Sequence, residues 1–169
     1  MLTEPIIEQR PAQKYMAIRS HVKMRDIPAL LPPLVPKVIA WLAEKGIAED
    51  GPVFFLYHSM EDDTLEVEVG VPVKTYSPGD GFIQPGTFPE GTYAAITYTG
   101  DYAHLKDAHM KLESWLAEKG LQEKIYTAAN GVVWGGRTEF YLTDPDTEPD
   151  VSQWRTDVVF LLEPLHVNS

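Results

Sequence analysis

One hexapeptide occurs twice in this chain of 169 residues. The string WLAEKG fills residues 41–46 and returns at residues 115–120. Two unrelated helix ends could share its last five letters, so the shared tryptophan carries much of the weight. Self-similarity at a long spacing is typical of a duplicated structural unit. We therefore expect two copies of one small fold.

Each copy of the repeat is preceded by a predicted strand. Residues 14–22 (KYMAIRSHV) and residues 92–99 (TYAAITYT) are short and rich in β-branched and aromatic side chains. This composition is typical of strands. A strand therefore opens the unit in each half.

A helix is predicted to carry each copy of the repeat at its end. In the first half it starts near residue 27 or 34 and ends at residue 45, because the prolines there are tolerated only in a first turn. In the second half it covers about residues 102–119, with apolar side chains at helical spacing. Gly46 and Gly120 follow, where a helix commonly ends in the left-handed conformation.

Two further strands are predicted after each helix. In the first half they are residues 52–58 and 64–73, joined by an acidic turn, and in the second half residues 137–143 and 155–162. Each half is thus a predicted βαββ unit, and the fold class is α+β. Such a unit covers one face of its own sheet, so the two are expected to pair with pseudo-twofold symmetry. The result would be an antiparallel sheet with two main helices and a cleft between the halves.

The domain organisation follows from this duplication. A single domain is predicted over residues 1–169, with halves at about residues 5–75 and 91–167. The connector, residues 76–90, is rich in glycine and proline, so it is predicted to be a loop. It is long enough to fold over the opening of the cleft.

Composition and charge exclude several classes of function. The formal net charge is -11, and nucleic-acid binding depends on neutralising phosphates with basic residues, so no nucleic-acid partner is expected. The chain has no cysteine, which excludes disulfides and thiolate chemistry and suits a cytoplasmic protein. No apolar run has the length of a signal peptide or a membrane span, so no membrane partner is expected. The five histidines are scattered, and neither a metal nor a cofactor is expected.

The order of strand, Trp-ended helix, strand and strand, given twice, resembles the GyrI-like effector-binding domain family. Residues 138–145 (TEFYLTDP) and residues 98–102 (YTGDY) are similar to segments of that family. The resemblance covers about residues 5–165. It implies a domain that binds small organic molecules, often hydrophobic cations, between its halves, with a buried carboxylate that matches Glu139. The length leaves no room for a helix-turn-helix part, so a stand-alone member is expected.

Glu139 is the first candidate for a ligand contact. It lies inside a predicted strand among aromatic and apolar neighbours, where it must face either solvent or a polar pocket. Tyr141 is two residues further on, so it shares a strand face with Glu139. Phe55 and Tyr57 lie on the corresponding strand of the first half, and Tyr57 is the predicted counterpart of Tyr141.

Five further side chains are weaker candidates for ligand contacts. Trp41 and Trp115 end the helices, where packing on the sheet is the simpler interpretation. Trp134 lies between two valines and two glycines, in a segment predicted to be flexible and near the pocket. Glu68 shares a strand face that is predicted to be solvated, and Tyr93 follows the connector.

Three classes of function remain open. The favoured prediction is a binding module that captures a small hydrophobic compound, often a cation, with Glu139 as counter-ion. The second is a hydrolase of reactive small molecules, in which Glu139 acts with Tyr57 or Tyr141 as catalytic residues. The third is an inhibitor or interaction protein that uses the acidic surface against an unknown protein partner.

Overall fold

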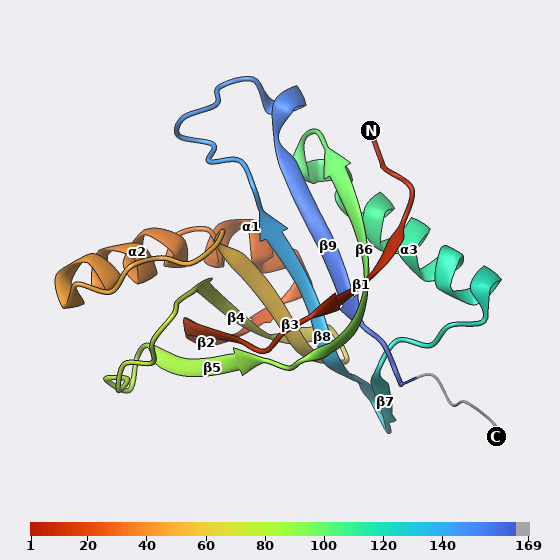
Figure 1. The fold of residues 1–169 in the computed structure, drawn as a ribbon, viewed down its shortest axis with the longest axis horizontal. Helices are drawn as coiled ribbons and strands as arrows, with labels where there is room; N and C mark the ends of the chain where they lie inside the picture. The colour runs from red at the N-terminus through yellow and green to blue at the C-terminus, as the bar shows by residue number, and fades with distance from the viewer. Residues whose placement is uncertain (165–169) are drawn as a thin grey trace.

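The chain forms one strongly curled antiparallel sheet with its main helices on one face, in a computed structural model that describes residues 1–164 (Figure 1). The strand order is β1-β6-β9-β8-β3-β4-β2-β5, and β7 pairs with β8 outside this path. The first half contains β1 (Ile6–Arg10), β2 (Gln13–Lys23), β3 (Phe54–Glu61) and β4 (Thr64–Pro72). The second half contains β5 (Gln84–Phe88), β6 (Gly91–Thr99), β7 (Ile125–Ala128), β8 (Gly131–Tyr141) and β9 (Arg155–Leu161).

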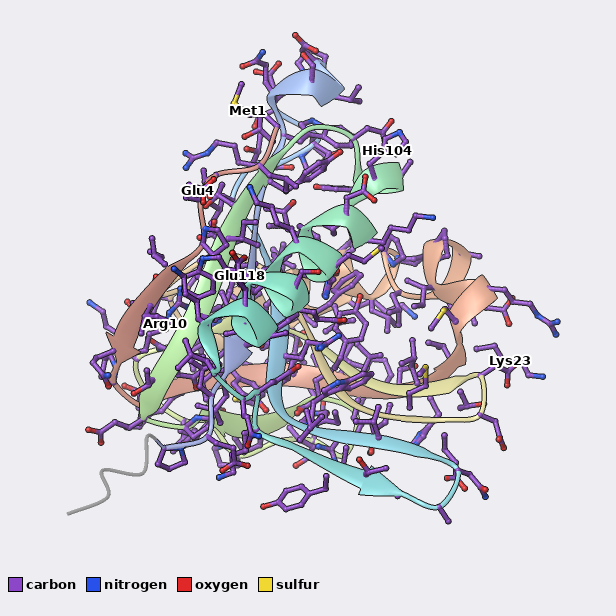
Figure 2. The ribbon with its side chains drawn as sticks, turned by 90° about the vertical axis from the view of Figure 1, so that its right-hand side faces the viewer. Met1, Glu4, Arg10, Lys23, His104 and Glu118 are labelled. Carbon is purple, nitrogen blue, oxygen red and sulfur yellow. The ribbon has the colours of Figure 1, made fainter. Side chains whose placement is uncertain are left out.

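Two long helices correspond to the two copies of the repeat. They are α2 (Leu34–Lys45) and α3 (Lys106–Lys119). Gly46 and Gly120 end them in the left-handed conformation, each with a φ of 69°, as predicted. Figure 2 shows α3 lying across the sheet. Shorter helical segments are η1 (Met24–Asp26), α1 (Ile27–Leu30), η2 (Tyr102–His104) and η3 (Val151–Gln153).

The two halves are related by a pseudo-twofold axis through the seam between β3 and β8. Equivalent backbone hydrogen bonds fix the correspondence: Val73 N donates to Lys14 O, and Leu162 N donates to Thr92 O. When this correspondence is extended to the neighbouring strands by their pairing registers, Phe55 is the counterpart of Glu139. The same two residues pair directly with each other across the seam. The predicted duplication is therefore confirmed, and the axis passes close to Glu139.

The first half has one more strand than the predicted βαββ unit, and the second half has two more, β5 and β7. β1 pairs with β6 at one end of the sheet, and β5 pairs with β2 at the other. Only two residues join β1 to β2, which spans about 11 Å at most, so the two ends of the sheet must lie close together. The sheet curls for this reason. The predicted connector loop thus contains a strand, β5, which pairs despite Pro85 because it lies at the sheet edge.

The remaining boundaries differ from the predictions in two places. The first helix breaks at residues 31–33, between α1 and α2, where two prolines lack the backbone N–H that a continuous helix needs. Residues 131–136, expected to be flexible around Trp134, are part of β8. Within the described residues, no single helix is long and apolar enough to cross a membrane. The bent pair Met24–Leu30 and Leu34–Lys45 is long and apolar enough only when its two helices are taken together.

The sheet has two different faces. Alternate side chains of β2, β4, β6 and β9 pack against Val38 and Trp41 of α2 or against Leu112 and Leu116 of α3, and we call this side the helix face. The intervening side chains form separate clusters without helix residues, and we call this side the bare face. The buried apolar members of the bare face are Tyr15, Ala17, Phe54, Leu56, Phe88, Tyr93, Ala95, Val159 and Leu161.

Candidate functional site

Glu139 lies in the middle of β8, on the helix face and beside the pseudo-twofold axis. Its neighbours Thr138 and Phe140 point to the bare face because side chains alternate along a strand. Only 6% of Glu139 is exposed. A carboxylate buried this deeply is costly unless polar groups satisfy it, so its partners decide what it can do.

Three side chains donate hydrogen bonds to the Glu139 carboxylate. Tyr57 Oη donates to Oε1 at 2.8 Å, and Tyr141 Oη donates to the same oxygen at 2.7 Å. His109 Nε2, from α3, lies 2.7 Å from Oε2 and donates to it. Tyr57 and Tyr141 are pseudo-symmetric counterparts, so the two halves contribute one hydroxyl each. The two halves thus meet at a single carboxylate.

This environment keeps the carboxylate ionised and the phenols protonated. Burial alone would raise the pKa of Glu139, but hydrogen bonds from His109, Tyr141 and Tyr57 outweigh it, and the pKa lies below its ordinary value. Burial and the nearby Glu139 charge raise the pKa of Tyr57 and of Tyr141 well above the ordinary value. Glu139 is therefore a carboxylate at neutral pH, and both tyrosines are donors.

Aromatic rings surround the carboxylate group. Phe55 meets Tyr141 edge-on with ring centroids 4.9 Å apart. Tyr102, from η2, contacts Tyr141 at 5.4 Å and stacks on Trp154 at 4.8 Å. Phe55 and Tyr102 thus both pack against Tyr141, one of the two tyrosines that donate to Glu139, and ring faces attract cations.

No strong cation neutralises this carboxylate. Within residues 1–164, no lysine or arginine nitrogen lies within 4.0 Å of Glu139, and its one ionic partner at that distance is His109. Arg137, two residues before it on the same strand face, is held instead by Glu123 at 2.5 Å and Glu113 at 3.0 Å. The negative charge of Glu139 is thus available to another cation.

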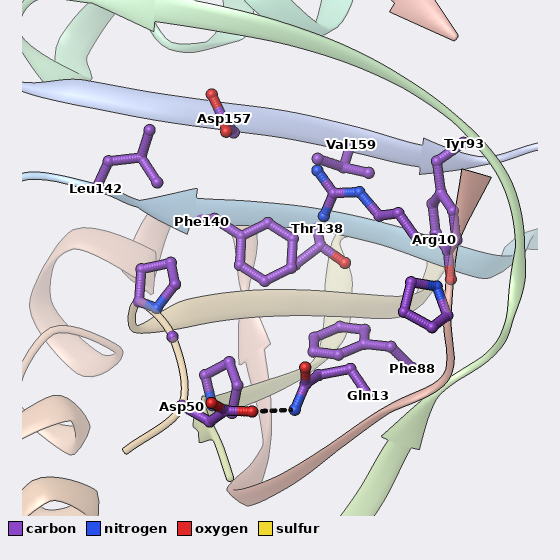
Figure 3. Close-up of a pocket in the computed structure, with 14 residues that line it drawn as sticks. Arg10, Gln13, Asp50, Phe88, Tyr93, Thr138, Phe140, Leu142, Asp157 and Val159 are labelled. Carbon is purple, nitrogen blue, oxygen red and sulfur yellow. Dashed lines mark hydrogen bonds between the residues drawn. The ribbon is translucent and has the colours of Figure 1, made fainter. Parts of the chain in front are cut away.

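The open space between the halves lies on the other side of the sheet. A cavity of about 310 Å³ occurs on the bare face, lined by residues of both halves (Figure 3). The rings of Phe88, Tyr93 and Phe140 form much of its wall, with Arg10 and Asp157 at its polar parts. Glu139 does not line it, because the sheet lies between them. A cleft between halves was predicted, and the structure places this cavity away from the predicted carboxylate.

A family model for the GyrI-like small molecule binding domain matches residues 3–163. The chain belongs to the GyrI-like family. No curated protein sequence is significantly similar to it. The match covers both halves, so this GyrI-like domain is a small-molecule binding fold from β1 to β9.

Solved structures share the fold at low sequence identity. The crystal structure of the EcmrR C-terminal domain is 20% identical, with a TM-score of 0.75 over 96% of this chain and 98% of that chain. An EcmrR–DNA complex is 22% identical with the same TM-score over 96% of this chain, which spans 58% of the EcmrR chain. SAV2435, solved bound to tetraphenylphosphonium, is 8% identical, with a TM-score of 0.64 over 95% of this chain and 94% of that chain. At such identities these matches show the fold alone.

The structure of this GyrI-like domain brings five of the predicted site residues together. Glu139, Tyr57 and Tyr141 are hydrogen-bonded, and Phe55 packs against Tyr141. Trp134 packs on the same helix-face cluster as Phe55 and Tyr141. Their contact with a ligand remains a prediction.

The other four predicted residues lie elsewhere in the GyrI-like domain. Trp41 is in the core under α2, with its indole Nε1 donating to Asp80 at 2.9 Å, and Trp115 packs on the core under α3. Tyr93 and Glu68 are on the bare face. The sheet therefore separates Tyr93 and Glu68 from Glu139.

Glu68 differs from its predicted surroundings. Its face was expected to be solvated, but Glu68 is 5% exposed. Tyr15 Oη donates to its Oε1 at 2.7 Å, and His58 Nε2 lies 2.5 Å from the same oxygen. Arg19 Nη2 is 3.5 Å away. The bare face curls over this strand, which strand alternation alone does not reveal.

Sequence reasoning missed His109 and Tyr102 as members of the Glu139 site. His109 was considered only as a metal ligand, and within residues 1–164 no group of three or more acidic or histidine side chains could hold a metal ion. A usable signal existed, because His109 follows Leu105 by four residues and precedes Leu112 by three. It therefore lies on the apolar side of α3, where a polar group needs a partner.

Proposed function

We propose that this GyrI-like domain binds a small hydrophobic organic cation on its helix face, with Glu139 as the counter-ion. The observation that carries the proposal is a buried, ionised carboxylate that lacks a lysine or arginine partner among the described residues. A carboxylate of this kind attracts a cation strongly because its surroundings screen charge less than water does. The bound tetraphenylphosphonium of SAV2435 is consistent with this ligand class on this fold.

The rings around Glu139 would supply contact area and selectivity. Phe55, Tyr102 and Trp134 offer apolar and π surfaces, and a cation over a desolvated ring gains about 2 kcal/mol. Together with one ion contact, this is enough for micromolar affinity, about -8 kcal/mol. Uncharged molecules of the same shape would lose the ion contact and bind more weakly.

Ligand entry requires a side chain to move. His109 occupies Oε2 of Glu139, and Tyr102 covers Tyr141 on the side of Trp154. Tyr102 is in η2, a single short turn at the start of α3, where few backbone hydrogen bonds resist displacement. We expect the cation to replace His109 at Oε2 and to push Tyr102 outward.

The direct test is titration calorimetry with tetraphenylphosphonium on the unmodified protein and two matched variants. Glu139→Gln keeps the size and removes the charge, so affinity should fall at least tenfold, about 1.4 kcal/mol. Glu68→Gln makes the same change at equal burial on the other face and should change affinity less than twofold. Equal affinity in all three proteins, with unchanged folding by circular dichroism, would contradict the proposal.

A second candidate function is hydrolysis of a reactive small molecule at the same residues. Two phenols donate to one buried carboxylate, which places a proton donor, Tyr57 or Tyr141, beside a nucleophilic Glu139. The raised pKa values of both phenols make them weak acids. The lowered pKa of Glu139 makes it a weak general base. Mass spectrometry of electrophilic substrates separates the two functions. Only an enzyme forms a product, and the Glu139→Gln variant should then form none.

The third class, an inhibitor that acts through the acidic surface, stays a prediction for a pull-down experiment at two salt concentrations.

A further inference from the structure

The cavity on the bare face is a pocket with both aromatic and charged side chains in its lining. Figure 3 shows Phe140 and Phe88 at its floor, Asp157 beside Leu142 on the strands above, and Arg10 extending over the strands from the edge. Its volume of about 310 Å³ is at the lower end for small-molecule pockets. Nothing in the Glu139 site uses these residues.

The pseudo-twofold axis explains why this space is open. The strand registers make Asp157 the counterpart of Glu68, and Thr97 the counterpart of Arg19. In the first half, the long side chains of Glu68, Arg19 and His58 lie within 3.5 Å of one another. In the second half, shorter side chains stand at the equivalent places, and the pocket remains.

The shorter side chains of the second half also leave one carboxylate, that of Asp157, without a counter-ion among residues 1–164. Glu68 has both His58 and Arg19 within 3.5 Å. Asp157 accepts one hydrogen bond, from Thr97 Oγ1 at 2.6 Å, and within residues 1–164 no cationic nitrogen lies within 4.0 Å of it. The position that the Arg19 guanidinium takes beside Glu68 in the first half thus corresponds, in the second half, to the pocket space beside Asp157.

The cation in the pocket is already engaged. Arg10 Nε donates to Glu8 at 2.7 Å, and its guanidinium lies 5.4 Å from the ring centroid of Phe140 and 5.8 Å from that of Tyr93. It therefore forms part of the wall and leaves the local charge balance negative. Asp50, at the opposite rim, has a single long contact of 3.4 Å with Gln13 Nε2.

We infer that this bare-face pocket binds a small protonated amine with an aromatic or apolar group. The ammonium would donate hydrogen bonds to Asp157, in the place that Arg19 takes beside Glu68, and the apolar group would lie on Phe140 and Phe88. A cation without N–H donors, such as tetraphenylphosphonium, cannot make these bonds. The pocket is thus a second site, chemically distinct from the one at Glu139.

The test uses phenethylamine as the probe and phenylacetate, of the same shape and opposite charge, as the control. Calorimetry should show saturable binding of phenethylamine and none of phenylacetate. Asp157→Asn should lower the affinity for phenethylamine at least tenfold, because the substitution removes the charge and keeps the shape. Glu139→Gln should change that affinity less than twofold. Loss of binding in Glu139→Gln with no change in Asp157→Asn would overturn the inference, as would equal binding of phenylacetate or no saturable binding.

A second variant protects the test against misfolding of Asp157→Asn. Thr97→Arg introduces the residue that the first half carries at the equivalent position, so its guanidinium should pair with Asp157 and occupy the pocket. We expect amine binding to fall at least tenfold while the melting temperature is kept or raised. Unchanged amine affinity in a folded Thr97→Arg protein would overturn the inference. Tetraphenylphosphonium affinity should not change in Asp157→Asn or in Thr97→Arg, so a failure of the Glu139 proposal is distinguishable from a failure of this inference.

Discussion

Glu139 and Glu68 are two buried carboxylates on opposite faces of one sheet, and their surroundings are similar in kind. Each is at most 6% exposed, and each has a tyrosine hydroxyl and a histidine Nε2 at hydrogen-bonding distance. Burial raises the pKa of both, and the hydrogen bonds lower it further than burial raises it. Hydrogen bonding alone therefore does not distinguish a binding carboxylate from a structural one.

The difference between them is the compensating charge. Arg19 lies 3.5 Å from Glu68, with more than half of its side chain in solvent, so the pair can stay charged at low cost. Glu139 instead receives a second tyrosine hydroxyl, which is neutral. Both carboxylates are satisfied, but among residues 1–164 only Glu68 of the two has a lysine or arginine nitrogen within 4.0 Å. An incoming cation gains most at Glu139.

The largest expected effect separates the two carboxylates by stability. Glu68→Gln removes the carboxylate that Tyr15, His58 and Arg19 share. It should lower the free energy of unfolding by about 2 kcal/mol, because hydrogen bonds to charged groups are stronger than neutral ones. Glu139→Gln removes an uncompensated buried charge and keeps an acceptor for both tyrosines, so it should cost less than about 1 kcal/mol. Urea denaturation of the two variants measures both. An equal cost would show that the charge of Arg19 is irrelevant at Glu68.

The next effect is the loss of stability in acid. Both carboxylates have pKa values below the ordinary 4.5, so each contributes stability that is present above about pH 4.5 and is lost as the pH falls through the lowered value. The free energy of unfolding of the double variant Glu68→Gln/Glu139→Gln should therefore fall less steeply between about pH 5 and pH 3. Denaturation curves at several pH values check this. An unchanged slope would mean that other carboxylates govern acid unfolding.

A smaller effect compares the two tyrosines at the pseudo-twofold axis. Tyr57→Phe and Tyr141→Phe each remove one hydrogen bond to the same oxygen of Glu139, so each should cost about 1 kcal/mol. Each should also raise the pKa of Glu139, because one stabilising donor is lost. Thermal denaturation and a pH titration of Glu139 by NMR measure the two consequences. A large difference between the variants would break the equivalence of the halves at this site.

The smallest effect compares the two tryptophans of the repeat. Trp41 Nε1 donates to Asp80, whose carboxylate also accepts from the amides of Phe82 and Ile83. Trp41→Phe keeps most of the packing and removes this link, so those two amides should exchange hydrogen faster. Trp115→Phe is the matched control and should leave them unchanged. Equal exchange in both variants would show that the link does not order this loop.

Features that depend on local sequence were predictable. The hexapeptide implied the duplication, the glycines at its end set the helix ends, and the two-residue period placed Tyr141 on the same strand face as Glu139. These properties follow from backbone geometry over a few residues. The correspondence of Tyr57 with Tyr141 could be predicted from the matching order of strands in the two halves.

Only the tertiary structure decided which distant groups meet. His109 reaches Glu139 because α3 packs on this face of the sheet, and Glu68 is buried because Tyr15 and His58 from other strands cover it. The edge strands β1 and β5 curl the sheet, and the pocket beside Asp157 lies inside that curl. Such contacts depend on strand register and side-chain length across the whole sheet, which a linear pattern of residues does not encode one position at a time.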